Sequence, residues 1–137
     1  MVKKILDKIS EKYTDQLYAV FRILAGFMFF QHGAQKLFGW FGGKAITDLS
    51  SLMGVAGIVE FFGGILIILG LFTRYTAILV GIQMFWAFYS VHFLNKGWSP
   101  IQNGGELAAL YFAIALVLLS QGSRAWSLER VLFKKEH

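Results

Sequence analysis

Long apolar runs separated by short polar segments make up most of the chain. The runs cover about residues 17–38, 52–72, 75–94 and 106–121. Each is close to the roughly 20 residues that an α-helix needs to cross a hydrocarbon core about 30 Å thick. The connections between them are rich in glycine and polar residues, which is typical of turns. The pattern predicts an all-α membrane protein, a bundle of four transmembrane helices.

The composition agrees with a membrane protein. Hydrophobic residues make up 56% of the 137 residues and charged residues 15%, whereas soluble domains average about 25% charged residues. The mean hydropathy is +0.58. The net charge is +5, but the basic residues lie at the chain ends and in short loops rather than on one basic, aromatic-rich face. We therefore expect the lipid bilayer, and no nucleic acid, as a partner.

The chain contains no cysteine. Thiol nucleophiles, disulfide exchange, iron–sulfur ligation and covalent haem attachment all require cysteine sulfur. A redox role would therefore need a bound cofactor or substrate.

Residues 1–16 form an amphipathic segment before the first apolar run. Apolar residues recur at helical spacing between lysines, which predicts a short helix on the inner membrane surface beside anionic lipid. A signal peptide is the alternative, but the segment lacks a small-x-small cleavage site. We expect a membrane domain at 17–122 and a basic cytoplasmic tail at 123–137.

The distribution of lysine and arginine predicts the orientation. With the N- and C-termini cytoplasmic, nine basic residues lie inside and three lie outside, as the positive-inside rule requires. The inner set is Lys3, Lys4, Lys8, Lys12, Arg74, Arg124, Arg130, Lys134 and Lys135, and the outer set is Lys36, Lys44 and Lys96. We expect a multi-pass protein of the inner or plasma membrane of the cell.

Several polar residues interrupt the first apolar run, where a charge near the bilayer centre costs about 2.5 kcal/mol or more. They are Arg22, Gln31, His32, Gln35 and Lys36. At about 100° per residue, Arg22, His32 and Lys36 share one helix side, which must face protein or water. One interpretation is that Arg22 and Lys36 reach opposite interfaces and His32 is an ordinary bundle residue.

The other interpretation is a functional pocket in the outer half of the bundle, because every predicted span brings an ionisable group there. The candidate catalytic residues are His32, Glu60, His92 and Glu106. The candidate substrate-binding residues are Gln35, Lys36, Phe85, Tyr89, Asn103 and Tyr111. Aromatic walls and proton-transfer groups together suit a flat apolar ligand. The competing hypothesis is an ion-pair network, Lys36 with Glu60 or Glu106, that only fixes helix register.

Three stretches of the chain resemble a known family. They read GFMFFQHGAQKLFG at 26–39, EFFGG at 60–64 followed by LGLFTR at 69–74, and NGGELAALY at 103–111. In this order and spacing, over about residues 17–122, they resemble the DoxX family of small bacterial membrane proteins. The resemblance implies a compact four-helix membrane bundle. It also implies an association with quinone-linked oxidation, thiol and oxidative stress, or quinone and catechol resistance.

The function expected from residues and resemblance together is that of a quinone-linked oxidoreductase component. His32 and His92 would bind the two oxygens of a quinone, and Glu60 or Glu106 would handle protons. A metal or haem site on His32 and His92 is a weaker alternative, and we expect no metal. A membrane anchor, an assembly factor or a small-molecule transporter is the non-enzymatic alternative, with partner oxidoreductase subunits or a homo-oligomer as candidate partners.

Overall fold

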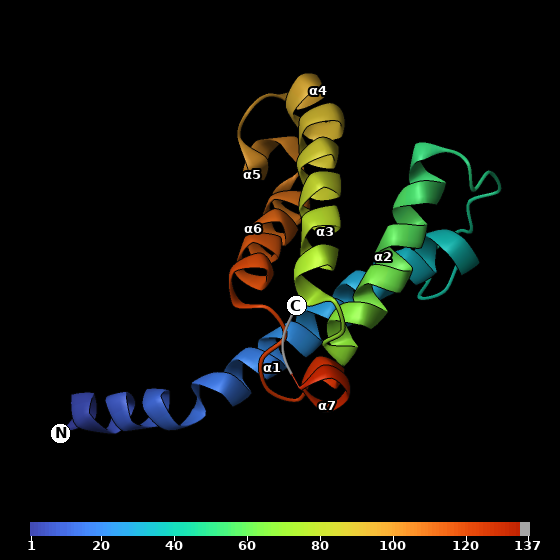
Figure 1. Ribbon diagram of the computed structural model, residues 1–137. Helices are drawn as coiled ribbons and strands as arrows, with labels where there is room; N and C mark the ends of the chain where they lie inside the picture. The colour runs from blue at the N-terminus through green and yellow to red at the C-terminus, as the bar shows by residue number, and fades with distance from the viewer. Residues whose placement is uncertain (135–137) are drawn as a thin grey trace.

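The computed structural model describes residues 1–134, and this part of the chain consists of helices and connecting loops without a β-strand. The elements are α1 (Val2–Phe38), α2 (Leu52–Leu69), α3 (Thr73–Ala87), the π-helical η1 (Phe88–Phe93), α4 (Leu94–Lys96), α5 (Pro100–Asn103), α6 (Glu106–Gln121) and α7 (Leu128–Phe133) (Figure 1). The predicted all-α class is confirmed. Lys135, predicted to belong to the basic tail, lies outside the described residues.

Two helical stretches of the described chain are long and apolar enough to cross a membrane. They are Leu52–Leu69 and Thr73–Lys96, the latter made of α3, η1 and α4 in continuous succession. The helix α6 is apolar but has only 16 residues. The helix α1 runs without interruption from the predicted surface segment through the first predicted span. Two of the four predicted spans are thus supported by length and apolarity.

The helices α1 and α2 pack closely along their length, and glycine makes this possible. A Cβ atom on Gly33 would lie 2.1 Å from the backbone nitrogen of Phe61, and one on Gly64 would lie 2.5 Å from that of Phe30. Backbones come this close in membranes only where side chains are absent or very small. Gly57 of α2 also contacts α1, at Lys36 and Leu37.

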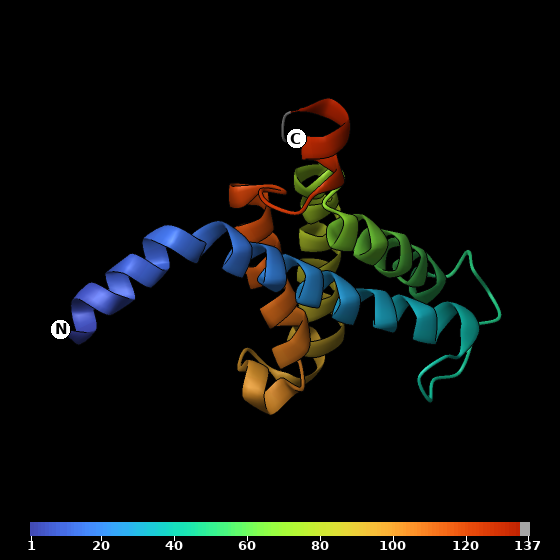
Figure 2. The same cartoon turned by 90° about the horizontal axis from the view of Figure 1, so that it is seen from below.

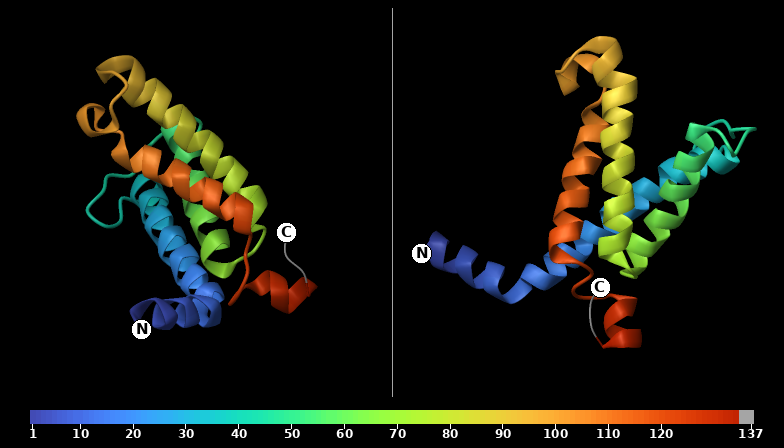
Figure 3. Two further views of the ribbon diagram at one scale, coloured as in Figure 1. Left: turned by 90° about the vertical axis from the view of Figure 1, so that its left-hand side faces the viewer. Right: turned by 45° about the horizontal axis from the view of Figure 1, so that its top comes forward.

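The helices α3 and α6 form the second close pair. The α1/α2 pair diverges from it beyond the short turn that joins α2 to α3, as Figure 1 and the right-hand view of Figure 3 show. This turn confirms the predicted tight helical hairpin. The buried core lies where the pairs meet and consists of Phe29, Ile67, Ala77, Val80, Met84, Tyr111, Ala115 and Leu118. At the other end of the molecule the pairs separate.

Arg22 joins the C-terminal segment to the end of the bundle. Its side chain is fully buried and donates hydrogen bonds to the carbonyl oxygens of Ile67 (3.0 Å) and Trp126 (2.8 Å), and also to those of Ile68, Ser123 and Ala125. The interpretation that Arg22 reaches the membrane interface is therefore wrong. Its guanidinium offers five donors in a fixed plane, which suits a cluster of carbonyl groups.

Buried polar contacts extend this cluster into the tail. The Ser123 hydroxyl donates to the Glu129 carboxylate (2.8 Å) and also lies 2.7 Å from the hydroxyl of Thr73. All three side chains are almost completely buried. The start of the predicted tail is therefore packed against the bundle, although its composition suggested a solvated segment.

The loop between α1 and α2 lies at the end of the molecule opposite to the Arg22 cluster. The Ser51 hydroxyl caps α2 by accepting a hydrogen bond from the backbone of Gly54 (3.1 Å). The Asp48 carboxylate accepts hydrogen bonds from the hydroxyl and the backbone nitrogen of Ser50, and these lower the pKa of Asp48.

Candidate functional site

A cavity of about 590 Å³ lies between the two helix pairs, on the side where they diverge. Its walls come from α1, α2, α3, η1 and α6, and they are mainly apolar. Its polar lining includes His32, Lys36, Glu60, Gln83, His92 and Tyr111. The volume is in the range of about 300–1,000 Å³ that is usual for small-molecule sites. An apolar slot with a few convergent polar groups is the arrangement that binds a small, flat, mostly apolar molecule.

Glu60 is the centre of the polar wall. It is 3% exposed, and each of its carboxylate oxygens has a partner from a different helix. Lys36 of α1 forms an ion pair with Oε2, and Gln83 of α3 donates from Nε2 to Oε1 over 2.9 Å. Gln83 thus satisfies its amide through a residue of another helix. This Lys36–Glu60 ion pair is one that the competing hypothesis of a purely structural ion-pair network predicted. Both of its residues also line the cavity.

Tyr111 brings a hydrogen-bonding group that is not used within the described chain. Its side chain is 4% exposed, and its hydroxyl oxygen is buried without a hydrogen-bond partner among residues 1–134. Its ring packs against Phe29 at 5.3 Å and edge-on against His32 at 5.8 Å between centroids. A buried unpaired hydroxyl costs about 1–3 kcal/mol, so it requires an explanation, and a ligand in the adjoining cavity provides one.

His92 lines the other end of the cavity and is held by the backbone of Asn103. Its Nδ1 lies 3.1 Å from the Asn103 carbonyl oxygen. Because a carbonyl oxygen can only accept, Nδ1 carries the proton of this bond, and Nε2 is the ring nitrogen left for a ligand. His92 is part of the π-helical η1, a local widening that frequently occurs at functional sites.

The Asn103 side chain acts within the protein. It is fully buried, donates to the carbonyl oxygen of Gly97 (2.8 Å) and accepts from the backbone nitrogen of Gly105 (2.7 Å). These bonds fix the corner between α5 and α6. Asn103, predicted to bind substrate, is thus placed to position His92 instead.

Two further predicted polar site residues, besides Asn103, lie outside the cavity lining. Glu106 is exposed in the first turn of α6, where a carboxylate is favoured by the helix dipole. Gln35 donates a hydrogen bond to the carbonyl oxygen of Phe41 (3.2 Å), in the loop after α1. These positions give both residues a local structural role.

Two of the three predicted aromatic site residues, Phe85 and Tyr89, also lie outside the cavity lining. Phe85 is 59% exposed and its ring lies 6.0 Å from that of Phe112. Tyr89 is 41% exposed and stacks on Phe93 at 5.6 Å. The structure therefore brings together His32, Lys36, Glu60, His92 and Tyr111, and the other predicted site residues do not line the cavity.

Sequence reasoning left Gln83 out of the site, although it lines the cavity and completes the hydrogen bonds of Glu60. An amide in the middle of an apolar span was the available signal, because such groups require a partner in hydrocarbon. The apolar walls, which include Leu79, Ile82 and Trp86, were also missed. The spacing of these residues in the sequence does not distinguish a cavity wall from a lipid-facing surface.

A metal site is not assembled by the described residues. No group of three or more His, Asp or Glu side chains within residues 1–134 comes close enough to hold a metal ion. His32 and His92 both line the cavity, but no third ligand of this kind accompanies them.

Comparison with known proteins identifies relatives along most of the chain. Residues 17–93 match the model of the DoxX family. An uncharacterised protein of Haemophilus influenzae is 39% identical over 132 residues, which cover 91% of this chain and 97% of that protein. A Bacillus subtilis protein named "Putative oxidoreductase CatD" is 28% identical over 119 residues, which cover 82% of this chain and 84% of that protein. No solved structure matches.

Proposed function

Because this chain belongs to the DoxX family, we propose that it is a multi-pass protein of the cell membrane that binds a quinone or a related small aromatic molecule in its cavity. In this proposal it acts as a component of a quinone-linked oxidoreductase, with a role in thiol or oxidative stress or in quinone detoxification. The oxidoreductase name of the Bacillus subtilis relative supports the redox part of the proposal.

The observation that carries the proposal is the unpartnered Tyr111 hydroxyl beside the Lys36–Glu60 pair in an apolar cavity. A quinone offers a flat apolar ring and two carbonyl oxygens that accept hydrogen bonds. Tyr111 would donate to one of these oxygens, and His92, which also lines the cavity, is available for the other. The residues present therefore fit the ligand.

A bound quinone supplies the capacity to accept two electrons and two protons. The residues of this chain would orient the ring, exclude water and hold protons close to its oxygens. Lys36 and Glu60 share a hydrogen bond across which a proton can move without leaving the cavity. In this proposal the electrons come from a bound substrate or from a partner oxidoreductase subunit.

The proposed topology has four spans with both termini in the cytoplasm. The α2–α3 turn, the end of α6 and α7 lie at one end of the molecule (Figure 1). Arg74, Arg124 and Arg130 belong to this end. The excess of positive charge supports its placement on the cytoplasmic side. The α1–α2 loop and the α4–α5 corner would then face outward.

The test is to purify the protein gently and to identify extracted small molecules by mass spectrometry. Glu60→Gln keeps the size of the side chain but removes the charge that holds Lys36. Glu106→Gln is the matched control, because Glu106 lies outside the cavity. Since hydrogen bonds to charged groups contribute about 1.5–3 kcal/mol, we expect a loss of bound aromatic molecule of about tenfold or more in Glu60→Gln only.

The same measurement separates the alternatives. An aromatic molecule present in the wild type and in Glu106→Gln, and depleted in Glu60→Gln, supports the proposed ligand and site. Bulk lipid alone in all three samples contradicts it and favours the non-enzymatic anchor or assembly function. The glycine faces of α1 and α2 already contact each other within the chain, so they do not themselves indicate an oligomer.

A further inference from the structure

We propose that the first part of α1, residues 2–16, and the helix α7 together form a surface that lies on the anionic headgroups of the membrane. We refer to these two segments as the lipid platform. It is located at the end of the molecule that holds the α2–α3 turn. The proposal is independent of the ligand in the cavity.

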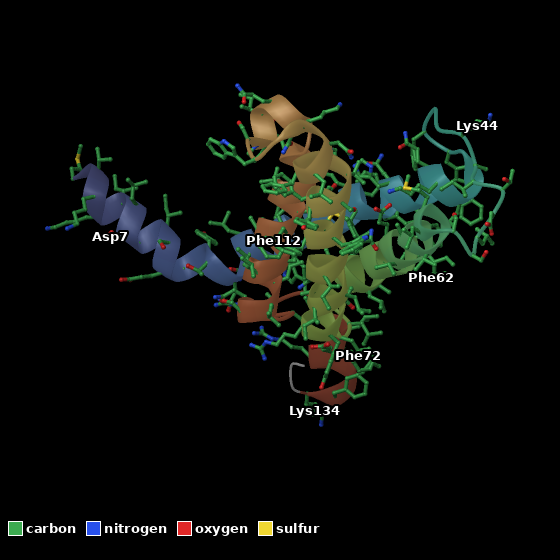
Figure 4. All side chains as sticks on the ribbon, turned by 90° about the horizontal axis from the view of Figure 1, so that it is seen from above. Asp7, Lys44, Phe62, Phe72, Phe112 and Lys134 are labelled. Carbon is green, nitrogen blue, oxygen red and sulfur yellow. The ribbon has the colours of Figure 1, made fainter. Side chains whose placement is uncertain are left out.

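The first part of α1 extends beyond the rest of the molecule. It runs across the direction of α3, at the level of the α2–α3 turn and α7 (Figures 1 and 3). Figure 2 shows the same protruding segment from below, and in Figure 4 Asp7 of this segment lies far from the other helices. An ion pair between Asp15 and Arg124 (2.8 Å) fixes its base to the tail. A helix spanning the bilayer would follow α3, whereas this segment has the direction of a helix lying in the membrane plane.

The two sides of this segment differ in a way that identifies its surroundings. Within the bundle, the side of α1 that holds Arg22 and Phe29 is buried against other helices. Along residues 2–16 the continuation of that side is charged and exposed, with Lys4, Lys8 and Glu11. A buried protein contact would require apolar side chains there, so this side faces water.

The opposite side remains apolar along its whole length. Ile5, Leu6 and Ile9 are 52%, 59% and 44% exposed, and the same side continues into Leu17 and Leu24, which are exposed on the outside of the bundle. The outside of a membrane bundle faces lipid. A continuous apolar side that begins in lipid and leads into a charged, amphipathic helix is typical of a segment lying in the membrane interface.

The helix α7 has the same character at the same end. Val131 and Leu132 are 73% and 61% exposed. An apolar groove of about 330 Å³ lies between α7 and the end of α2, lined by Leu69 and Trp126 among others, and Arg130 is at its border. An apolar groove beside a cation fits the upper part of an acyl chain with an acidic headgroup.

Basic residues surround both apolar surfaces. The platform carries the basic residues Lys3, Lys4, Lys8, Lys12 and Arg130, and Lys134 follows α7 directly. Its exposed acidic residues without an ion pair to the tail are Asp7 and Glu11, because Asp15 pairs with Arg124 and Glu129 is buried. Basic side chains on an amphipathic helix bind the anionic lipids of a membrane surface. The four exposed lysines of residues 2–16 outnumber the exposed Asp7 and Glu11, and this excess favours an anionic lipid surface over a second copy of the chain, whose platform would carry the same excess.

The absence of cysteine allows a direct test with single spin labels. Ile9→Cys and Glu11→Cys place labels on opposite sides of the same helix, about 160° apart at 100° per residue. The full chain is reconstituted in phosphatidylcholine vesicles with or without phosphatidylglycerol. We expect the Ile9 label to be accessible to oxygen dissolved in lipid and the Glu11 label to an aqueous nickel complex. A label at Val131→Cys should behave like that at Ile9.

The charge dependence is tested with a matched pair of variants. Replacing Lys3, Lys4, Lys8 and Lys12 by glutamine should abolish the increase in lipid accessibility that phosphatidylglycerol produces at Ile9. Replacing Lys44 and Lys96, at the other end of the molecule, should leave it unchanged. Equal aqueous accessibility of the two α1 labels in both lipid mixtures would overturn the proposal. So would protection of Ile9 that increases with protein concentration in detergent, because this indicates a second copy.

Discussion

Two positively charged side chains of α1, Arg22 and Lys36, point into the bundle, and their surroundings differ. Arg22 is fully buried, and its guanidinium is surrounded by backbone carbonyl oxygens of α2 and of the tail. Lys36 has one carboxylate partner, Glu60, and both line a cavity of about 590 Å³. The first cluster is closed by the chain itself, whereas the second leaves space beside it.

This difference separates a structural charge from a candidate functional one. A buried ion is tolerated when the protein satisfies its hydrogen-bonding capacity, and Arg22 then holds the end of the bundle together. The outer cluster combines a charge pair with an unpaired hydroxyl, that of Tyr111, next to an apolar space. An unpaired hydrogen-bonding group beside a cavity is typical of a binding site without its ligand.

The largest expected effect is on stability, from Arg22→Leu. The change leaves several buried carbonyl groups of the tail and α2 without a donor, so we expect a loss of about 3–5 kcal/mol in the free energy of unfolding. Unfolding of the detergent-solubilised protein by increasing denaturing detergent measures it. Lys36→Met is the comparison variant, with a smaller expected loss because Gln83 still binds Glu60. Equal losses in the two variants would mean that the outer pair is structural as well.

A smaller loss is expected from Gly33→Ala, which tests the close pair of α1 and α2. The added methyl group would lie 2.1 Å from the Phe61 backbone nitrogen, so the helices must separate. Overpacking of this kind costs about 1–3 kcal/mol. Gly81→Ala is the control, because its Cβ would meet Ala115 at an ordinary 3.6 Å. The thermal midpoints of both variants in detergent provide the measurement, and similar midpoints would show that the close approach is not required.

The smallest effect on stability, and the most informative for the site, is expected from Tyr111→Phe. The variant removes a buried hydroxyl that has no partner in the described chain, so stability should stay the same or increase by about 1 kcal/mol. Binding of a soluble short-chain quinone should weaken about fivefold to tenfold, because one hydrogen bond of about 1 kcal/mol is lost. Titration calorimetry measures the affinity. Unchanged affinity would exclude Tyr111 as a ligand donor.

The sequence predicted the parts of the fold that depend on local pattern. The apolar runs and their glycine-rich boundaries located the helices, and the 100° spacing placed Arg22, His32 and Lys36 on the side of α1 that faces the other helices. These features depend on residues close together along the chain. The polar groups at His32, Lys36, Glu60 and His92 were identifiable for a related reason, since ionisable side chains in apolar spans require special surroundings.

The site itself required the tertiary structure. Glu60 and Glu106 were equivalent candidates in the sequence, and only the divergence of the helix pairs places Glu60 in the cavity and Glu106 outside it. Asn103 changed from a predicted ligand contact to a support for His92, because the corner after α4 turns its side chain inward.

The sequence alone thus determined the helical class, the family resemblance and the polar residues that the membrane makes costly. The tertiary structure decided which of those residues meet, because contacts between helices depend on crossing angles and on how closely backbones approach. It also decided the different surroundings of Arg22 and Lys36 in α1. The tail folds back to surround Arg22, while nothing in the described chain fills the space beside Lys36 and Glu60.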